Sequence, residues 1–113
     1  MTAGEFRKLA LALPRAVESS HVSHPDFRVV GKVFASLGVP DASWGMVRLT
    51  PEDQRSFIGR APAVFQPCSG AWGWRGYTNV FLEAATKTVA RPALQPATGS
   101  PSLYSACSLF NSP

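Results

Sequence analysis

Apolar residues near the start of the chain recur every three or four positions, as they do on one face of a helix. The stripe consists of Phe6, Leu9, Ala10 and Leu13. Thr2, followed three positions later by Glu5, has the pattern of a capping box, in which each side chain accepts a hydrogen bond from the other residue's backbone N–H. We therefore predict a helix over residues 2–13 that ends before Pro14 and lays its apolar stripe on a sheet.

The next strong pattern is a β-hairpin between Asp26 and Leu37, whose apolar residues flank the pair Gly31-Lys32. Glycine at the first position of a two-residue loop suits a type II′ turn, so we predict that Val30 lies opposite Val33. Strand side chains alternate between faces. The predicted core face carries Phe27, Val29 and Phe34, and the other face carries Arg28, Val30, Val33 and Ala35.

Residues 17–23 are polar and tolerate extended structure, so they are a candidate edge strand. Alternation predicts a strand over residues 45–49 and another over 77–82, the latter with Thr78, Val80 and Leu82 on one side. Between them, Thr50 followed by Pro51 predicts the start of a helix, because threonine caps helices and proline is tolerated at the first helical position. A short extended piece and a turn rich in glycine and tryptophan, residues 70–76, come before the last strand.

The C-terminal part differs from the rest of the chain. A last helix can begin over residues 83–90, but Pro92 and Pro96 follow, and proline breaks a helix interior. All the charged residues lie at or before Arg91, and the last 22 residues are rich in serine and proline. We therefore predict a folded domain over residues 1–91, and a tail over 92–113 that adds little to the core.

The order of these elements predicts the α+β class, with an antiparallel sheet covered by helices on one face. At 113 residues the chain has the length of a single domain with one modest core. No apolar run is long enough for a signal peptide or a membrane span, and two cysteines are too few for a disulfide framework. These features predict a cytoplasmic location and no membrane partner.

The net charge is +4, and eight of the eleven cationic residues are arginines, which bind phosphate through paired hydrogen bonds. The arginines are scattered along the sequence, so folding would have to assemble any basic patch. A polyanionic partner and ordinary solubility are both compatible with this charge.

The turn over residues 70–76 is the best candidate for a binding site. Trp72, Trp74 and Tyr77 surround Arg75, and this combination can stack on bases and neutralise phosphates. The alternative is that Trp72 fills the core and that the glycines only allow tight turning. The segment lacks the GK[ST] of a P-loop, and a strand follows it where a dinucleotide-binding loop would begin a helix.

Patterns for catalysis and metal binding are weak. His21, His24 and Asp26 could be imagined around a metal, but the spacing is more typical of a polar loop. Cys68 and nearby serines lack the surroundings of known nucleophiles. The sequence therefore predicts no catalytic residue, no metal ligand and no cofactor.

Six blocks of the chain, in order, resemble the MmcQ/YjbR family, a DUF419-type family of small bacterial proteins with a CyaY-like α+β fold. The blocks are FRKLALALP, ESSH, DFRVVGKVFASL, LTPEDQ, VFQP and GAWGWRGYTNVFL. The resemblance covers roughly residues 1–90, whereas the tail departs from the family pattern. It implies the CyaY-like fold and a role in DNA binding.

We predict a small non-enzymatic binding protein that contacts DNA weakly and with little sequence selectivity. The side chains expected to make contact are Arg28, Lys32, Arg48, Trp74, Arg75 and Tyr77. The cations would meet phosphates, and the two aromatic rings would stack on exposed bases. The alternative is a module that binds a protein partner or a small ligand through the same surface.

Overall fold

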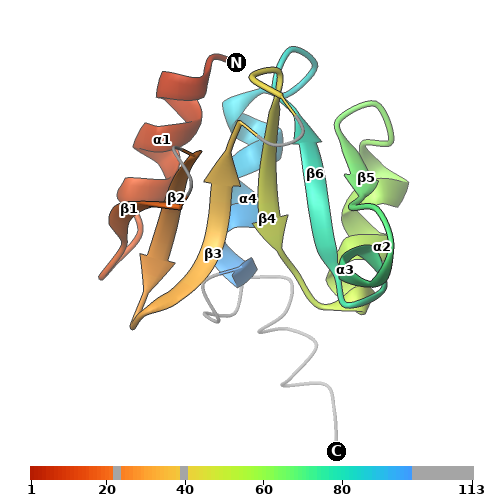
Figure 1. Cartoon of the computed structure of the whole chain (residues 1–113). Coiled ribbons are helices and arrows are strands. Elements are labelled where there is room, and N and C mark those ends of the chain that lie inside the picture. Colours follow the sequence, from red (N-terminus) through yellow and green to blue (C-terminus); the bar gives the residue numbers. More distant parts are fainter. Residues whose placement is uncertain (22–23, 39–40, 98–113) are drawn as a thin grey trace, which may run out of the picture.

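A computed structural model of the chain describes residues 1–21, 24–38 and 41–97. Its centre is a sheet in the order β1-β2-β3-β4-β6-β5, in which all neighbours are antiparallel (Figure 1). The strands are β1 (Val17–His21), β2 (His24–Val29), β3 (Lys32–Leu37), β4 (Trp44–Arg48), β5 (Phe65–Pro67) and β6 (Tyr77–Phe81). The helices are α1 (Ala3–Leu11), α2 (Pro51–Arg60), α3 (Ala71–Trp74) and α4 (Lys87–Ala97). The predicted α+β class is confirmed.

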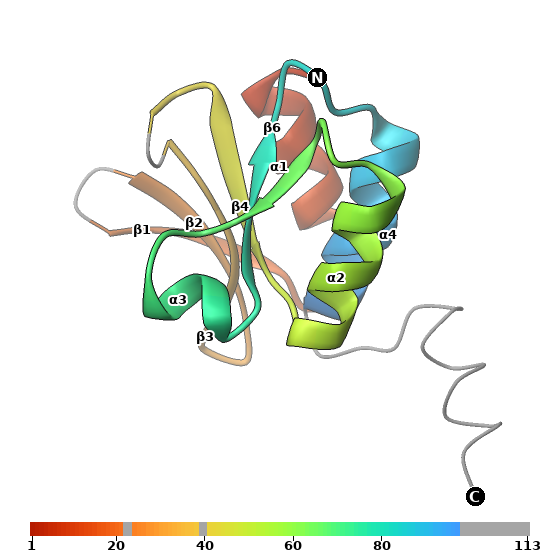
Figure 2. The same ribbon diagram turned by 90° about the vertical axis from the view of Figure 1, so that its right-hand side faces the viewer.

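Three of the helices lie on one side of the sheet. Figure 2 shows α1, α2 and α4 on that side, and the short α3 on the opposite side near β6. We call the face of the sheet away from α1 and α4 the open face. The sheet therefore has one face packed into a core and one face available for contact, as antiparallel sheets commonly do.

The core lies between the covered face and the helices. Its largest fully buried side chains are Phe6, Phe27, Phe34, Phe65, Leu94, Val47 and Val80. Both predicted helix starts are correct, because Thr2 accepts a hydrogen bond from the backbone N–H of Glu5 and Thr50 accepts one from that of Asp53. The predicted edge strand is also present, as β1.

The turn between β2 and β3 differs from the prediction by one residue. Val29 pairs with Lys32, so the two turn residues are Val30 and Gly31, and both have positive φ, 52° and 77°. Positive φ at both central residues defines a type I′ turn in place of the predicted type II′ turn. This turn matches the twist of the strands, which outweighs the preference of valine for other backbone conformations.

The predicted faces of β3 are partly wrong as well. Phe27 pairs with Ala35 and Arg28 pairs with Val33, so Phe34 is an extra residue in a β-bulge. The bulge interrupts the alternation of side chains, and consequently Phe34 and Ala35 are both buried. Ala35 therefore lies in the core and not on the face predicted for it.

The prediction that Pro92 and Pro96 end the last helix is wrong, since α4 contains both prolines. Pro92 is exposed, whereas the buried residues Ala90, Ala93, Leu94 and Ala97 recur at the spacing of one helical face. Burial of this face offsets the backbone hydrogen bond that proline cannot donate. Residues 92–97 therefore belong to the packed domain, and the rest of the predicted tail lies outside the described residues.

In the part of the chain that the structure describes, no helix has both the length and the apolar character needed to cross a membrane.

Candidate functional site

Three glycines shape the turn that carries α3. Gly70 and Gly76 have φ of +67° and +104°, a backbone region that residues with a Cβ atom rarely adopt. A Cβ atom on Gly73 would overlap the carbonyl oxygen of Cys68, and one on Gly76 would overlap that of Leu49. The spacing G-x-x-G-x-x-G therefore lets the turn lie directly against the neighbouring backbone.

A buried glutamine holds this turn against α2. Gln54 is 8% exposed, and its Nε2 donates to the carbonyl oxygens of Gly73 at 3.0 Å and Tyr77 at 3.1 Å. The Thr78 hydroxyl donates to the Gly76 carbonyl at 2.8 Å. The same three carbonyls also accept hydrogen bonds from backbone N–H groups, those of Gly76, Cys68 and Leu49. The side-chain bonds therefore add to the backbone bonds and fix the position of α3 beside the first turn of α2.

The aromatic side chains of this turn are exposed. Trp72 is 56% and Trp74 is 86% exposed, so Trp72 does not fill the core, as one interpretation of the sequence proposed. The ring of Trp72 meets the ring of Tyr77 edge to face, with centroids 5.0 Å apart, and the Arg75 guanidinium lies 5.5 Å from the Trp72 ring centroid. Trp72 thus orients Arg75, and Trp74 presents its ring to solvent.

Arg75 lines a pocket of about 410 Å³ together with Arg48 and Tyr77. Arg48 pairs with Tyr77 across β4 and β6, and the residues next to them in each strand, Val47 and Thr78, are buried in the core. Arg48 and Tyr77 therefore lie on the open face. We call this the arginine pocket; its other lining residues are Leu49, Thr50, Pro96 and Ala97.

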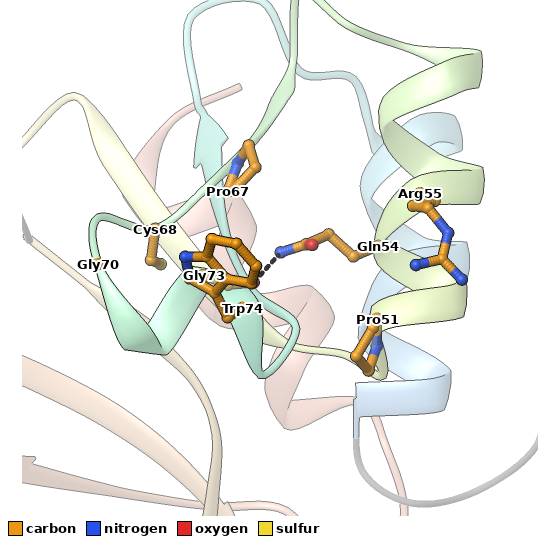
Figure 3. A pocket seen from close by; sticks show the side chains of 8 residues that line it. All are labelled: Pro51, Gln54, Arg55, Pro67, Cys68, Gly70, Gly73 and Trp74. Carbon is orange, nitrogen blue, oxygen red and sulfur yellow. Dashed lines mark hydrogen bonds between the residues drawn. The ribbon is translucent and has the colours of Figure 1, made fainter.

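A second pocket, of about 390 Å³, lies between α2 and the turn of α3 (Figure 3). Trp74 is on one side of it, Pro51 and Arg55 are on the other, and Gln54 reaches across between them. We call this the tryptophan pocket; its remaining lining residues are Pro67, Cys68, Gly70 and Gly73. The sequence predictions included Trp74 but missed Gln54 and Arg55, because no local pattern indicates that α2 lies beside α3.

Two of the predicted contact residues lie elsewhere. Arg28 is on β2 and makes two hydrogen bonds, at 2.9 and 3.1 Å, to the buried carboxylate of Asp26, which raises the pKa of the guanidinium. Lys32 is exposed at the first position of β3. The structure therefore brings Arg48, Arg75 and Tyr77 together, places Trp74 in the adjoining pocket, and leaves Arg28 and Lys32 on the β2–β3 hairpin.

The chemistry of Cys68 does not favour nucleophilic catalysis. Burial raises the pKa of its thiol to about 11, and its Sγ lies 3.1 Å from Asn79 Oδ1, to which the thiol donates. The group is therefore a neutral thiol at physiological pH, and the thiolate is the reactive form of cysteine. Over residues 1–21, 24–38 and 41–97 no cluster of three or more His, Cys, Asp or Glu side chains could hold a metal ion.

No protein-family model matches this sequence, and no curated protein matches it. The structure is similar to the crystal structure of the Deinococcus radiodurans protein DR2400, which has a DUF419 domain, with a TM-score of 0.68. The fold is that of a DUF419 domain. The alignment covers 85% of this chain and 75% of DR2400 at 15% sequence identity, so the likeness is one of fold. This DUF419 fold is the one that the resemblance to the MmcQ/YjbR family implied.

Proposed function

We propose that this protein binds single-stranded nucleic acid through α3 and the two pockets beside it, without catalysing a reaction. The observation that carries the proposal is the 86% exposure of Trp74, which lines the tryptophan pocket, while the next residue, Arg75, lines the arginine pocket. Large aromatic residues that are exposed, and so do not contribute to the core, occur more often at binding surfaces than elsewhere on protein surfaces.

The pairing of aromatic and cationic groups favours a single strand over a duplex. In a single strand the faces of the bases are available, and stacking of one base on an aromatic ring contributes about 1–3 kcal/mol. Arg48 and Arg75 line the same pocket and supply two guanidinium groups for one phosphate. The four-residue α3 is too short to read a major groove in the manner of a recognition helix.

Titration of the intrinsic tryptophan fluorescence with single- and double-stranded oligonucleotides at two ionic strengths tests the proposal. We expect tighter binding of the single strand, and a marked loss of affinity at the higher salt concentration. Arg75→Ala should weaken binding, whereas Arg91→Ala, which removes the same charge from an exposed position on α4, should have little effect. Equal effects of the two substitutions would contradict a localised site.

The second candidate function is binding of a small ligand or a protein partner at the same surface. The observation that favours it is the presence of two adjoining pockets of about 390 and 410 Å³, within the size range of small-molecule sites. Such binding would depend little on salt if apolar contacts dominate. The salt arm of the titration therefore separates the two functions.

A further inference from the structure

The orientation of the Gln54 amide is fixed by its neighbours. Its nitrogen contacts two carbonyl oxygens, those of Gly73 and Tyr77, and only the NH₂ group can donate to both. The other end of the amide, Oε1, is therefore the acceptor that remains for a ligand.

No described residue donates a hydrogen bond to Gln54 Oε1. Among the described residues, every fully buried side-chain nitrogen or oxygen has a hydrogen-bond partner. Because Oε1 has none, it is not fully buried, and it contacts solvent although Gln54 as a whole is only 8% exposed. Gln54 lines the tryptophan pocket, and this pocket is where a donor could reach it. A well-positioned acceptor in a mostly apolar pocket is the type of group that sets ligand orientation.

The walls of the tryptophan pocket suit a flat ring. Trp74 lies on one side of the pocket and Arg55 on the other, with Gln54 between them, as Figure 3 shows. Bases stack both on aromatic side chains and on the planes of arginine side chains. A volume of about 390 Å³ is at the small end for a ligand site, and so fits one base better than a larger molecule.

The two pockets are neighbours along two segments of the chain. Thr50 lines the arginine pocket and Pro51 the tryptophan pocket, and in the same way Arg75 lines the first and Trp74 the second. Consecutive Cα atoms are only about 3.8 Å apart. One nucleotide can therefore place its base in the tryptophan pocket and an adjoining phosphate in the arginine pocket.

We infer that the tryptophan pocket holds one nucleobase with an exocyclic amine (adenine, cytosine or guanine), which lies against Trp74 and Arg55 and donates to Gln54 Oε1. Thymine and uracil fit less well, because the N3–H of each base is flanked by two carbonyl oxygens, and these oxygens need hydrogen-bond donors. The NH₂ group of Gln54 cannot serve as that donor, because it already donates to the carbonyls of Gly73 and Tyr77. This inference rests on the proposed function, and adds a preference at one position of an otherwise unselective strand.

Oligonucleotide chemistry tests the inference on the unaltered protein. The probes are a dodecamer of thymidine, the same strand with one central adenine, and the same strand with unsubstituted purine in place of that adenine. We expect the adenine strand to bind about threefold to tenfold more tightly than the thymidine strand, the range of one added hydrogen bond. Purine stacks but lacks the amine, so the purine strand should lose most of this gain.

A protein variant tests whether the base lies in the pocket. Arg55→Ala should weaken binding of the adenine and purine strands by the same factor, because both bases contact this side chain, and Arg91→Ala should affect neither strand. If the thymidine strand binds but adenine, purine and thymine are equivalent, the base pocket is overturned while the proposed function stands. If no strand binds to the unaltered protein, the proposed function fails and the base pocket fails with it.

Discussion

Gly73 and Gly59 are both in helical segments, but their surroundings differ. A Cβ atom on Gly73 would overlap the Cys68 carbonyl, whereas a Cβ atom on Gly59 in α2 would have no heavy atom within 4 Å. We therefore expect Gly73→Ala to lower the free energy of unfolding by about 1–3 kcal/mol, as overpacking does. Urea denaturation measures this change, and the fluorescence of the adjoining tryptophans reports whether the turn is displaced.

Gly59→Ala is the matched control for Gly73→Ala. It adds the same methyl group to a helix with open space around it, so we expect an unfolding free energy about 0.4–1 kcal/mol higher than that of the unaltered protein. Equal changes in the two variants would mean that the packing of Gly73 against Cys68 does not set the shape of the turn.

The raised pKa of Cys68 predicts a dependence of stability on alkaline pH. The folded protein holds the thiol proton more tightly than the unfolded chain does, where the pKa is near 9.0. The contribution of this group to stability is therefore complete below pH 9, and is lost as the pH rises through about 11.

Cys68→Ser isolates this contribution, because serine keeps a donor for Asn79 but does not ionise in this range. Denaturation curves collected between pH 8 and pH 11 should show a steeper fall in unfolding free energy for the unaltered protein than for the variant. Parallel curves would show that the thiol is not buried as described.

Single residues with a strong local preference were predictable from the sequence. Thr2 and Thr50 cap α1 and α2 as expected, because capping depends on residues only three positions apart. Gln54 was not predictable, since its partners are in another segment and its role depends on tertiary packing. Local chemistry can be derived from a single sequence, whereas a long-range hydrogen bond cannot.

Among the elements, the β2–β3 hairpin carries a strained residue. Val30 has φ of 52°, a backbone conformation that is unfavourable for a β-branched residue. Its side chain is 77% exposed, so packing contacts do not offset this cost in folding free energy. Val30→Asn creates the Asn-Gly pair that type I′ turns favour, and we expect it to raise the free energy of unfolding by about 1 kcal/mol.

Val17→Asn is the control for the hairpin variant. Val17 is also exposed, at 56%, but it lies in the extended strand β1, where asparagine is disfavoured. We expect this substitution to leave stability unchanged or lower it. A similar rise in both melting temperatures would indicate that removal of an exposed valine, and not the turn geometry, causes the effect.

Helix α4 shows why an element can be missed by local rules. Proline in a helix interior costs about 3 kcal/mol, which justified ending the helix before Pro92. The four buried residues at helical spacing are alanines and one leucine, a stripe too small to be conspicuous in the sequence. Packing of α4 against α1 and the sheet decides the outcome, and this packing is defined only once the whole domain is assembled.

At the scale of the whole molecule, the predicted contact residues divide into two groups. Arg48, Arg75 and Tyr77 meet because β4 pairs with β6, although a helix, β5 and α3 separate these strands in the sequence. Periodicity predicted both strands but not that they are neighbours in the sheet. Whether these side chains come together could therefore be decided only from the fold. Arg28 and Lys32 lie on β2 and β3, farther across the sheet.

This separation predicts that the contribution of Lys32 depends on the length of the ligand. Neighbouring strands are about 4.8 Å apart, so Lys32 on β3, which is two spacings from β6, is separated from Tyr77 by on the order of 10 Å. A dinucleotide bound at Arg75 and Tyr77, on the far side of β4, would leave Lys32 outside its contacts, whereas a dodecamer would cover it. Lys32 is the better of the two residues to test, because Arg28→Ala would leave the buried Asp26 carboxylate without its partner.

We expect Lys32→Ala to leave the affinity for a dinucleotide unchanged and to weaken binding of a dodecamer by about 0.5–1 kcal/mol at low salt, the value of an exposed ion pair. Lys8→Ala removes the same charge from an exposed position of α1, on the covered side of the sheet, and should affect neither ligand. Fluorescence titration of both ligands measures the difference. If the lysine substitutions weaken dodecamer binding equally, attraction depends on net charge alone, and the strand does not extend from α3 to the β2–β3 hairpin.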